Sequence, residues 1–342
     1  MKCIRLIRQG EAKQAFEHCS LSLPTMKEDE VKIKVNCFGL NFADVMARRG
    51  LYKDAPPIPC VLGYEVAGIV EKVGQNVQGL KEGDRVLAFT HFGGYATHVI
   101  SPSDAVLKIS EKISFESAVA LATQYVTAYY AAIYCGTMKK DDTVLIHSGA
   151  GGVGIALIQL ALLQGCSTII STAGSDSKTD FISKLGVHKA INYNKSDFKK
   201  IIETEFGTTP LDTAYDAVGG ENFKKSMQLI NHGGRMVSYG ASSRLNENFG
   251  FLSLLKTAFD FGIYHPVQFI MNSKSLVGVN MLRIAETKPN VLKHCLQEVV
   301  KLAEEEKLNP VIHQVYSDAD IAQAHNDLES RKSIGKLVVK WE

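Results

Sequence analysis

The chain has 342 residues, of which 45% are hydrophobic and 22% charged, a composition typical of globular proteins. Its 38 Lys and Arg residues against 36 Asp and Glu residues give a formal net charge of +2. No strong field therefore directs the chain to nucleic acid or anionic lipid. A chain of this length predicts two domains, because single hydrophobic cores stop growing near about 250–300 residues.

The first residues are expected to form a strand rather than a signal peptide, because Arg5 and Arg8 interrupt the apolar pattern and no cleavage site follows. No stretch approaches the ~18 apolar residues of a membrane span. The seven cysteines are scattered and odd in number, which argues against a disulfide framework and favours a reducing compartment. We therefore expect a cytoplasmic protein.

Residues 1 to about 122 alternate strand-like segments with turns rich in Gly and Pro. Segments such as VKIKVNCFGL, VAGIVEKVG and GDRVLAF have the composition of strands. This part of the chain is expected to form a small β-barrel.

From about residue 125 to 280 the pattern changes to alternating strands and helices, which predicts a parallel sheet with helices on both faces. The expected strands are residues 143–147, 167–172, 189–193, 211–218, 235–240 and 274–279. Toward the end of the chain we expect one long helix, 290–307, and a last strand, 336–341.

Residues 244–274 do not fit this alternation, because they form a connection longer than the usual few residues. We interpret this aromatic-rich insert as a helical excursion that covers the edge of the sheet. The alternative is a partner or membrane surface, in which Phe251, Leu254, Leu255 and Phe259 would make the contact.

The sharpest motif is HSGAGGVG, residues 147–154. Gly149, Gly151 and Gly154 form the pattern G-x-G-x-x-G directly after an expected strand and at the start of an expected helix. Glycines permit the tight turn, and the helix N-terminus directs N–H groups and the positive end of its dipole at a pyrophosphate. The motif therefore predicts a dinucleotide site.

The end of the second expected strand distinguishes NAD from NADP. An acidic residue there would bind the ribose 2′-hydroxyl of NAD, but this strand continues into the small residues Gly174 and Ser175. These residues leave room for a 2′-phosphate, and Lys178 supplies positive charge, so we expect NADP(H). The alternative is that Lys178 is a solvated residue at a helix start and that Asp176 is the N-cap of that helix.

Three segments in this order, GYEVAGIVEKVGQNVQGLKEGDRV, HSGAGGVG and GKLVV, resemble the medium-chain dehydrogenase/reductase superfamily over essentially the whole chain. The resemblance implies an α/β protein of two domains. Residues 1–123 and 282–342 would form a GroES-like β-barrel catalytic domain, and residues 124–281 a Rossmann domain with a doubly wound parallel sheet.

In the zinc-dependent members of that superfamily, a cysteine stands where this chain has Asn41 and a histidine where it has Tyr64. Those members often carry four closely spaced cysteines near residues 90–115, and this chain has none there. A catalytic zinc needs three convergent protein ligands, and the sequence contains no Cys-x-x-Cys or His-x₃-His pair. We therefore expect no metal site.

Within the superfamily the chain is similar to the quinone oxidoreductases, through LNFADVMARRGLY, PPIPCVLGYE and INYNKSDF, and its insert looks like that of the vesicle amine transport protein subgroup. The resemblance implies NADPH-dependent, zinc-independent reduction of quinones or other α,β-unsaturated carbonyls. Together with the glycine-rich motif it gives the expected cofactor-binding residues, with Thr127 near the nicotinamide: Thr127, Ser148, Gly149, Gly151, Gly152, Val153, Gly174, Ser175, Lys178, Tyr193 and Gly240.

Without a metal, the hydride acceptor must be intrinsically electrophilic, and its developing oxyanion needs a hydrogen-bond donor. Asn41, Tyr52 and Tyr64 are the expected catalytic residues. Asn41 has the alternative role of capping the following helix, and Tyr64 that of packing beneath the pocket. Glu65 is interpreted as a buried carboxylate that pairs with a base, because isolated buried charges are costly.

Two other functions stay open: an enoyl-thioester reductase, and a non-catalytic NADPH-binding scaffold that associates with a membrane. The expected strand 274–279 would be the exposed edge of the sheet. Because exposed edges tend to be paired, we expect a homodimer through this strand.

Overall fold

The computed structural model describes residues 1–242 and 261–342, which form two compact units. The first unit comprises Met1–Val126 and Met281–Glu342, and the second comprises Thr127–Asn280. Most of the 244–274 insert, including the four residues of its predicted apolar surface, lies outside the described part of the chain.

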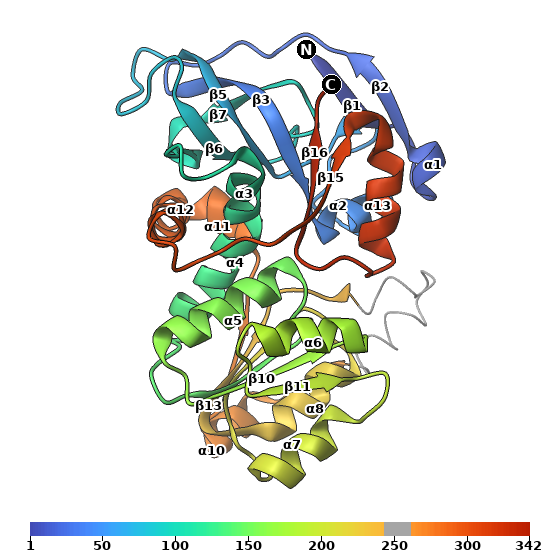
Figure 1. The fold of residues 1–342 in the computed structure, drawn as a ribbon, viewed down its shortest axis with the longest axis vertical. Coiled ribbons are helices and arrows are strands. Elements are labelled where there is room, and N and C mark those ends of the chain that lie inside the picture. The colour runs from blue at the N-terminus through green and yellow to red at the C-terminus, as the bar shows by residue number, and fades with distance from the viewer. Residues whose placement is uncertain (243–260) are drawn as a thin grey trace. The chain divides into compact units, whose positions relative to one another are not determined.

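The first unit is built mainly from antiparallel strands (Figure 1). One sheet has the strand order β2-β1-β4, and a seven-stranded sheet has the order β15-β16-β3-β5-β6-β8 with β7 paired to β3. Its strands are β1 (Lys2–Leu6), β2 (Phe16–Ser20), β3 (Glu30–Leu40), β4 (Cys60–Val61), β5 (Glu65–Val73), β6 (Arg85–Phe89), β7 (His98–Pro102), β8 (Val106–Lys108), β15 (Ile312–Ser317) and β16 (Lys336–Lys340).

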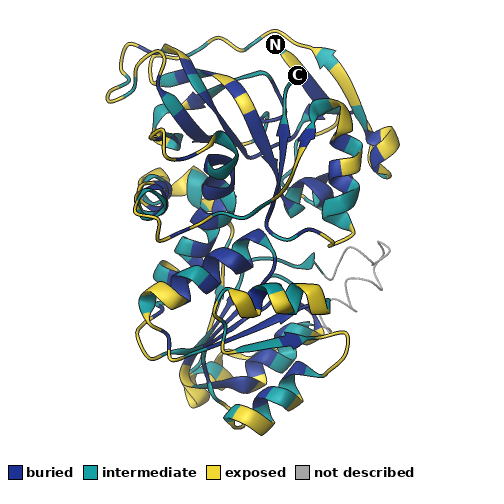
Figure 2. Cartoon of the chain, viewed as in Figure 1, coloured by how far each residue is buried: buried dark blue, intermediate teal, exposed yellow. Residues whose placement is uncertain are grey.

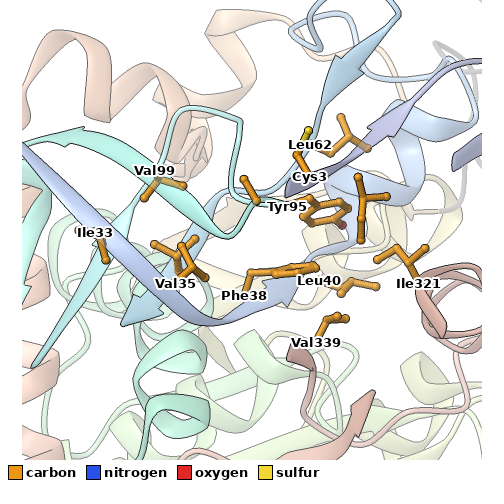
Figure 3. Packing of buried hydrophobic residues seen from close by; sticks show 14 of the residues in the cluster. Cys3, Ile33, Val35, Phe38, Leu40, Leu62, Tyr95, Val99, Ile321 and Val339 are labelled. Carbon is orange, nitrogen blue, oxygen red and sulfur yellow. The ribbon is translucent and has the colours of Figure 1, made fainter. Parts of the chain in front are cut away.

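The helices of the first unit lie in the connections between these strands. They are α1 (Ala12–Ala15), α2 (Phe42–Arg48), η1 (Ser103–Ala105), α3 (Phe115–Ala120), the π-helical η2 (Leu121–Tyr125), α11 (Met281–Thr287), α12 (Pro289–Glu304), η5 (Asp318–Asp320) and α13 (Ile321–Glu329). The first half of β3 alternates buried and more exposed residues, as expected for a strand with one covered face. Phe38, Leu40, Tyr95 and Val339 meet in the core of this unit (Figure 3).

The second unit contains a six-stranded sheet in the order β11-β10-β9-β12-β13-β14, and every pair in it is parallel. Its strands are β9 (Thr143–Ile146), β10 (Thr168–Ala173), β11 (Lys189–Asn192), β12 (Leu211–Asp216), β13 (Ile230–Ser238) and β14 (Ser275–Gly278). Its helices are η3 (Tyr130–Cys135), α5 (Gly152–Gln164), α6 (Asp176–Lys184), α7 (Phe198–Phe206), α8 (Glu221–Leu229) and α10 (Pro266–Asn272), and the short α4 (Val126–Tyr129) spans the unit boundary.

Helices α5 and α6 lie on one face of the parallel sheet, and α7 and α8 lie on the other (Figure 1). The central strands are buried along their length, while the outer faces of the helices are exposed (Figure 2). From β9 the chain adds β10 and β11 on one side of the sheet and then β12, β13 and β14 on the other, so the strand order reverses between β9 and β12. The predicted fold class, an α/β protein with a doubly wound parallel sheet beside a β-rich unit, is confirmed.

Candidate active site

The glycine-rich turn joins the carboxyl end of β9 to the first residue of α5. Ser148 adopts the left-handed φ of 55°, and the Gly149 N–H donates to the Thr172 carbonyl over 2.9 Å. A side chain at Gly149 would overlap Ser171 Oγ, and a Cβ at Gly154 would lie 2.7 Å from Gly149 Cα. These two glycines are therefore required by close packing between the turn, the helix and β10.

Gly151 has a different environment from its two neighbours in the motif. A Cβ there would meet only the Ser148 carbonyl, at 3.2 Å, so the space beside it is open. Gly151 is the N-cap of α5 and provides no side chain to satisfy the amides of Gly152 and Val153 in the first helical turn. This helix N-terminus has the form of an anion-binding site.

The ends of β10 and β11 lie side by side and contribute the next candidate residues. A Cβ at Gly174 would lie 2.5 Å from Tyr193 Oη, so only glycine permits the tyrosine to approach this closely. Asn194 Nδ2 donates to the Gly174 carbonyl over 2.7 Å and holds the two strand ends together. The Ser175 Oγ accepts from the Lys178 N–H over 3.4 Å and caps α6. The alternative that Asp176 caps this helix is wrong.

Asp176 is the acidic residue nearest the end of β10, and it is already paired. Its carboxylate accepts from Lys195 Nζ and from Asn192 Nδ2, and these bonds lower the pKa of Asp176. Lys178 lies in the first turn of α6 and is half-buried, and burial lowers the pKa of its amino group. Two lysines thus lie near the end of β10, and one of them neutralises the nearby carboxylate.

The end of β13 lies beside the end of β12. A Cβ at Gly240 would lie 2.7 Å from the Ala217 carbonyl, so a larger residue would push the two strand ends apart. Asp216 accepts from the Val218 and Gly219 N–H groups over 2.7 and 2.9 Å, which fixes the turn after β12. The sequence analysis missed Asp216 as a residue that shapes this edge of the sheet, because only the fold brings the ends of β12 and β13 together.

Most of the predicted cofactor residues therefore gather at the carboxyl ends of β9, β10, β11 and β13. Ligands of doubly wound sheets bind at this edge, where the strand order reverses. Thr127 is half-buried in α4, a helix that does not directly follow any strand of the parallel sheet. It stays a predicted contact.

In the first unit, Asn41 belongs to a fully buried network with Glu65 and Lys336. Asn41 Nδ2 donates to Glu65 Oε1 over 2.7 Å, and Lys336 Nζ donates to Asn41 Oδ1 over 2.9 Å and also to Glu65. Burial raises the pKa of Glu65, and the ammonium of Lys336 opposes that rise. The prediction that Glu65 pairs with a base is confirmed.

Asn41 is also the N-cap of α2, as its alternative role predicted. Its backbone N–H donates to Asp44 Oδ2 over 2.8 Å, and the Asp44 N–H donates back to the Asn41 carbonyl over 2.9 Å. Gly39 lies directly before this site, and a Cβ there would overlap Glu65 Oε1 and Lys336 Cε. The buried network thus depends on a glycine in β3.

Tyr64 lies between β4 and β5 with 4% of its surface exposed. Its ring meets Tyr52 edge-on, with centroids 6.4 Å apart, and packs against Phe92 at 5.0 Å. Within the described part of the chain, the buried Tyr64 hydroxyl makes no hydrogen bond of ordinary geometry, but it interacts weakly with the Tyr52 hydroxyl. Burial raises the pKa of both tyrosines, so each is a neutral phenol near pH 7.

Asp44 is a fully buried carboxyl that the sequence analysis missed as a site residue. It accepts from the Asn41 N–H and, over 3.2 Å, from the Gly63 N–H just before Tyr64. Burial raises the pKa of Asp44 to about 7, and the two backbone donors oppose that rise. Asp44 therefore anchors the turn that presents Tyr64.

A charged cluster holds the loop that carries Tyr52. Arg283 of α11 pairs with Asp54 in this loop and with Glu286, over 2.8 Å in the second case. Glu286 in turn pairs with His91 over 2.8 Å, next to Phe92. The sequence analysis missed this cluster because its members are up to 229 residues apart.

The donor set at this site differs from that of a zinc centre. Among residues 1–242 and 261–342, no group of three or more His, Cys, Asp or Glu side chains is placed to hold a metal ion. An amide and a phenol, Asn41 and Tyr64, stand where the resemblance puts zinc ligands. None of the helices formed by the described residues is long and apolar enough to cross a membrane.

Two family models match the chain. Residues 27–111 match the alcohol dehydrogenase GroES-like domain, and residues 152–299 match the zinc-binding dehydrogenase family. The two matches agree with a β-rich unit and a doubly wound unit, and together they define the class of the protein as an oxidoreductase built on the alcohol dehydrogenase plan.

Individual relatives refine this class. The chain is 32% identical over 320 residues to the zebrafish (Danio rerio) synaptic vesicle membrane protein VAT-1 homolog, covering 93% of this chain and 66% of that protein. It is 29% identical over 341 residues to the pig (Sus scrofa) quinone oxidoreductase, covering 99% and 97%. The solved structure of Escherichia coli quinone oxidoreductase complexed with NADPH matches with a TM-score of 0.85 at 28% identity, covering 99% and 100%.

The chain therefore belongs to the medium-chain dehydrogenase/reductase superfamily, in the branch of the quinone oxidoreductases. The predicted family and the prediction that the chain is an oxidoreductase are confirmed.

Proposed function

We propose that this protein is an NADPH-dependent, zinc-independent reductase that transfers hydride to quinones or other α,β-unsaturated carbonyls. The observation that carries the proposal is the pair of sites just described. One unit contains a sheet edge that suits a dinucleotide, and the other contains two phenols, Tyr64 buried and Tyr52 half-buried, where the resemblance puts a metal centre. Residues 1–123 and 282–342 would form the catalytic domain, and residues 124–281 the cofactor domain.

The residues at the carboxyl edge of the parallel sheet fit a dinucleotide. Gly151 leaves its surroundings open, and the amides of Gly152 and Val153 at the N-terminus of α5 suit a pyrophosphate. The proposed cofactor contacts are Thr127, Ser148, Gly149, Gly151, Gly152, Val153, Gly174, Ser175, Lys178, Tyr193 and Gly240.

NADP is favoured over NAD by the charges near the end of β10. The carboxylate of Asp176 is neutralised by Lys195 and held by Asn192, so it repels a 2′-phosphate less than a free carboxylate would. Lys178 offers a positive charge to a 2′-phosphate, and Gly174 and Ser175 leave space for that group. The E. coli relative, which was crystallised with NADPH, supports the same choice.

Zinc independence is supported by the chemistry of the residues at positions 41 and 64. An amide and a neutral phenol are poor zinc ligands compared with the thiolate and imidazole that they replace. In addition, the Asn41 side chain is engaged at both ends by Glu65 and Lys336. The polarisation of the acceptor must therefore come from hydrogen-bond donors.

When bound, NADPH supplies the hydride, and the protein must stabilise the oxyanion that develops on the acceptor. Tyr64 suits this role because its hydroxyl is buried and interacts only weakly with the Tyr52 hydroxyl, outside ordinary hydrogen-bond geometry, so little is lost when it donates to an acceptor. Tyr52 is the second phenol and lies in a loop. Asn41 Nδ2 donates one of its two hydrogens to Glu65. Its role is therefore to donate the second hydrogen to the acceptor oxygen or to position the loop that carries Tyr52.

We also propose that the protein forms a homodimer through β14, the edge strand of the parallel sheet. Leu276 of β14 is 44% exposed, and the neighbouring α10 exposes Ile270 and Met271 by 77% and 79%. An edge strand beside apolar side chains favours pairing with a second copy. The seven free cysteines support a reducing, cytoplasmic location.

The experiment that tests this function follows NADPH oxidation against a panel of quinones, 2-alkenals and one enoyl thioester, with NADH and added Zn²⁺ as comparisons. The proposal expects turnover of quinones or 2-alkenals with NADPH, and no gain from Zn²⁺. Turnover of the enoyl thioester alone would identify an enoyl-thioester reductase. NADPH binding without turnover of any acceptor would favour the scaffold function and refute the proposal.

A further inference from the structure

Two thiols of the first unit lie in contact outside the candidate active site. Cys3 of β1 and Cys19 of β2 are direct partners in an antiparallel pair, and their Sγ atoms are 3.3 Å apart. Both are free cysteines, and Cys3 lies next to Leu62 and Tyr95 in the core (Figure 3). The proposed hydride transfer uses neither residue.

The backbone at this pair is compatible with a disulfide. Met1 and Leu21 exchange both backbone hydrogen bonds, over 2.8 and 3.0 Å, and the alternation of an antiparallel ladder makes Cys3 and Cys19 the next hydrogen-bonded pair. Cα atoms of such pairs are about 5.5 Å apart, inside the range of about 4.4–6.8 Å that a disulfide spans. A disulfide spans Cβ atoms about 3.5–4.5 Å apart, whereas facing Cβ atoms of an antiparallel pair lie about 4.5–5.5 Å apart, so a bond between the two sulfurs requires side-chain rotation and a small approach of the two strands.

The two thiols differ in access. Cys3 is fully buried, whereas Cys19 is partly exposed on β2, which is the edge of its three-stranded sheet. Burial and the adjacent Cys19 raise the pKa of Cys3 to about 12. Cys19 is therefore the thiol that a reagent in solution meets first, and Cys3 is placed behind it.

A cation lies on the same face of the hairpin. Arg5 and Glu17 are two residues along from Cys3 and Cys19, so all four side chains share one face. Arg5 Nη2 donates to Glu17 over 2.9 Å, while Arg5 Nε is buried with no hydrogen-bond partner among the described residues. The charge of Arg5 lowers the pKa of Cys3, but by less than burial and Cys19 raise it.

We propose that Cys3 and Cys19 form a reversible thiol–disulfide site that reacts with low-molecular-weight disulfides of the glutathione class. The Cys19 thiolate attacks one sulfur of the small disulfide, which forms a mixed disulfide on Cys19 and releases one thiol. Cys3 then gives its proton to the departing thiolate as its sulfur attacks Cys19 Sγ, so that the Cys3–Cys19 bond forms and the second thiol leaves. The protein loses two electrons to the small disulfide, and the two cysteine protons end on the two released thiols.

The test treats the full chain in native buffer with oxidised glutathione, blocks the remaining thiols with N-ethylmaleimide and maps tryptic peptides by mass spectrometry. Trypsin cleaves after Lys2, Arg5, Lys13 and Lys27, so the predicted bond joins the peptide 3–5 to the peptide 14–27. Dithiothreitol should abolish the joined peptide. The matched control, Cys60→Ser in the adjacent β4, should leave its yield unchanged.

Two variants separate the two steps. Cys19→Ser should lose the joined peptide and leave Cys3 unmodified, and Cys3→Ser should accumulate glutathione on Cys19 because no second thiol can displace it. The fluorescence of Trp341 in the same unit confirms that each variant is folded. The proposal is overturned if, after treatment with oxidised glutathione, both cysteines of the folded wild type carry N-ethylmaleimide and no joined peptide is found. It is also overturned if glutathione persists on Cys19 equally in the wild type and in Cys3→Ser.

Discussion

The buried network of Asn41, Glu65 and Lys336 allows a sharp test of the account of the first unit. Replacing Lys336 with Met keeps most of the side-chain volume but removes the ammonium that donates to Asn41 and Glu65. Both charged side chains are 0% exposed, so water cannot take the place of the lost donor. The variant therefore leaves Glu65 as a buried carboxylate without its cation.

Removing one partner of a fully buried ion pair costs about 3–5 kcal/mol. At about 2–4 °C per kcal/mol for a unit of this size, the unfolding midpoint should fall by about 6–20 °C. Part of the loss should be recovered at low pH, because protonation of Glu65 removes its charge. The penalty of the Lys336→Met change should therefore shrink as the pH falls toward 5.

The assay is urea or thermal unfolding followed by the fluorescence of Trp341, the single tryptophan, whose Nε1 donates to the Ala96 carbonyl over 3.0 Å within the same unit. The matched control is Lys340→Met on the same strand, where the lysine side chain is 45% exposed and pairs with Glu116. That exposed pair should contribute less than about 1 kcal/mol. Equal effects of the two substitutions would refute the assignment of the network as a buried structural unit.

Three further predictions concern the two sites. Lys178→Ala should raise the KM for NADPH by about tenfold and leave the KM for NADH nearly unchanged, because only NADPH carries the 2′-phosphate that makes a charge-assisted contact. Steady-state kinetics with both cofactors check this prediction, and an equal rise in both KM values would contradict it. Tyr64→Phe should lower kcat by about 10²-fold while leaving unfolding stability unchanged or higher, because the lost hydroxyl makes no hydrogen bond of ordinary geometry among the described residues; unchanged kcat contradicts the role of Tyr64. The pKa of Asp44, raised to about 7, makes its contribution to stability complete below about pH 4 and lost as the pH rises to 7. Urea unfolding should show this decline in the wild type and a smaller one in Asp44→Asn, and equal slopes would contradict it.

The parallel sheet was predictable from the sequence because its signals are local. Short apolar runs alternate with amphipathic helices, and the glycine-rich motif falls at the junction of β9 and α5. The predicted strands overlap β9 to β14 and differ at their ends, most at β13, which begins at Ile230 rather than at residue 235. The N-cap of α6 was less certain, because Ser175 and Asp176 are both good capping residues and only the backbone geometry selects Ser175.

Contacts between distant residues were not predictable. A base for Glu65 was expected on energetic grounds, but nothing local indicates Lys336, which is 271 residues away. The facing of Cys3 and Cys19 depends on the register of a hairpin, and a shift of one residue would turn one of the two side chains to the other face.

The central claim, metal-independent hydride transfer from NADPH to a conjugated carbonyl, is tested most directly with NADPH that carries deuterium at C4 of the nicotinamide. The enzyme is incubated with a 2-alkenal in the presence of a metal chelator, and the product is analysed by mass spectrometry. The account predicts one deuterium on the β-carbon of the product, at a rate that the chelator does not change. A product without deuterium, or turnover that the chelator abolishes and Zn²⁺ restores, would contradict it.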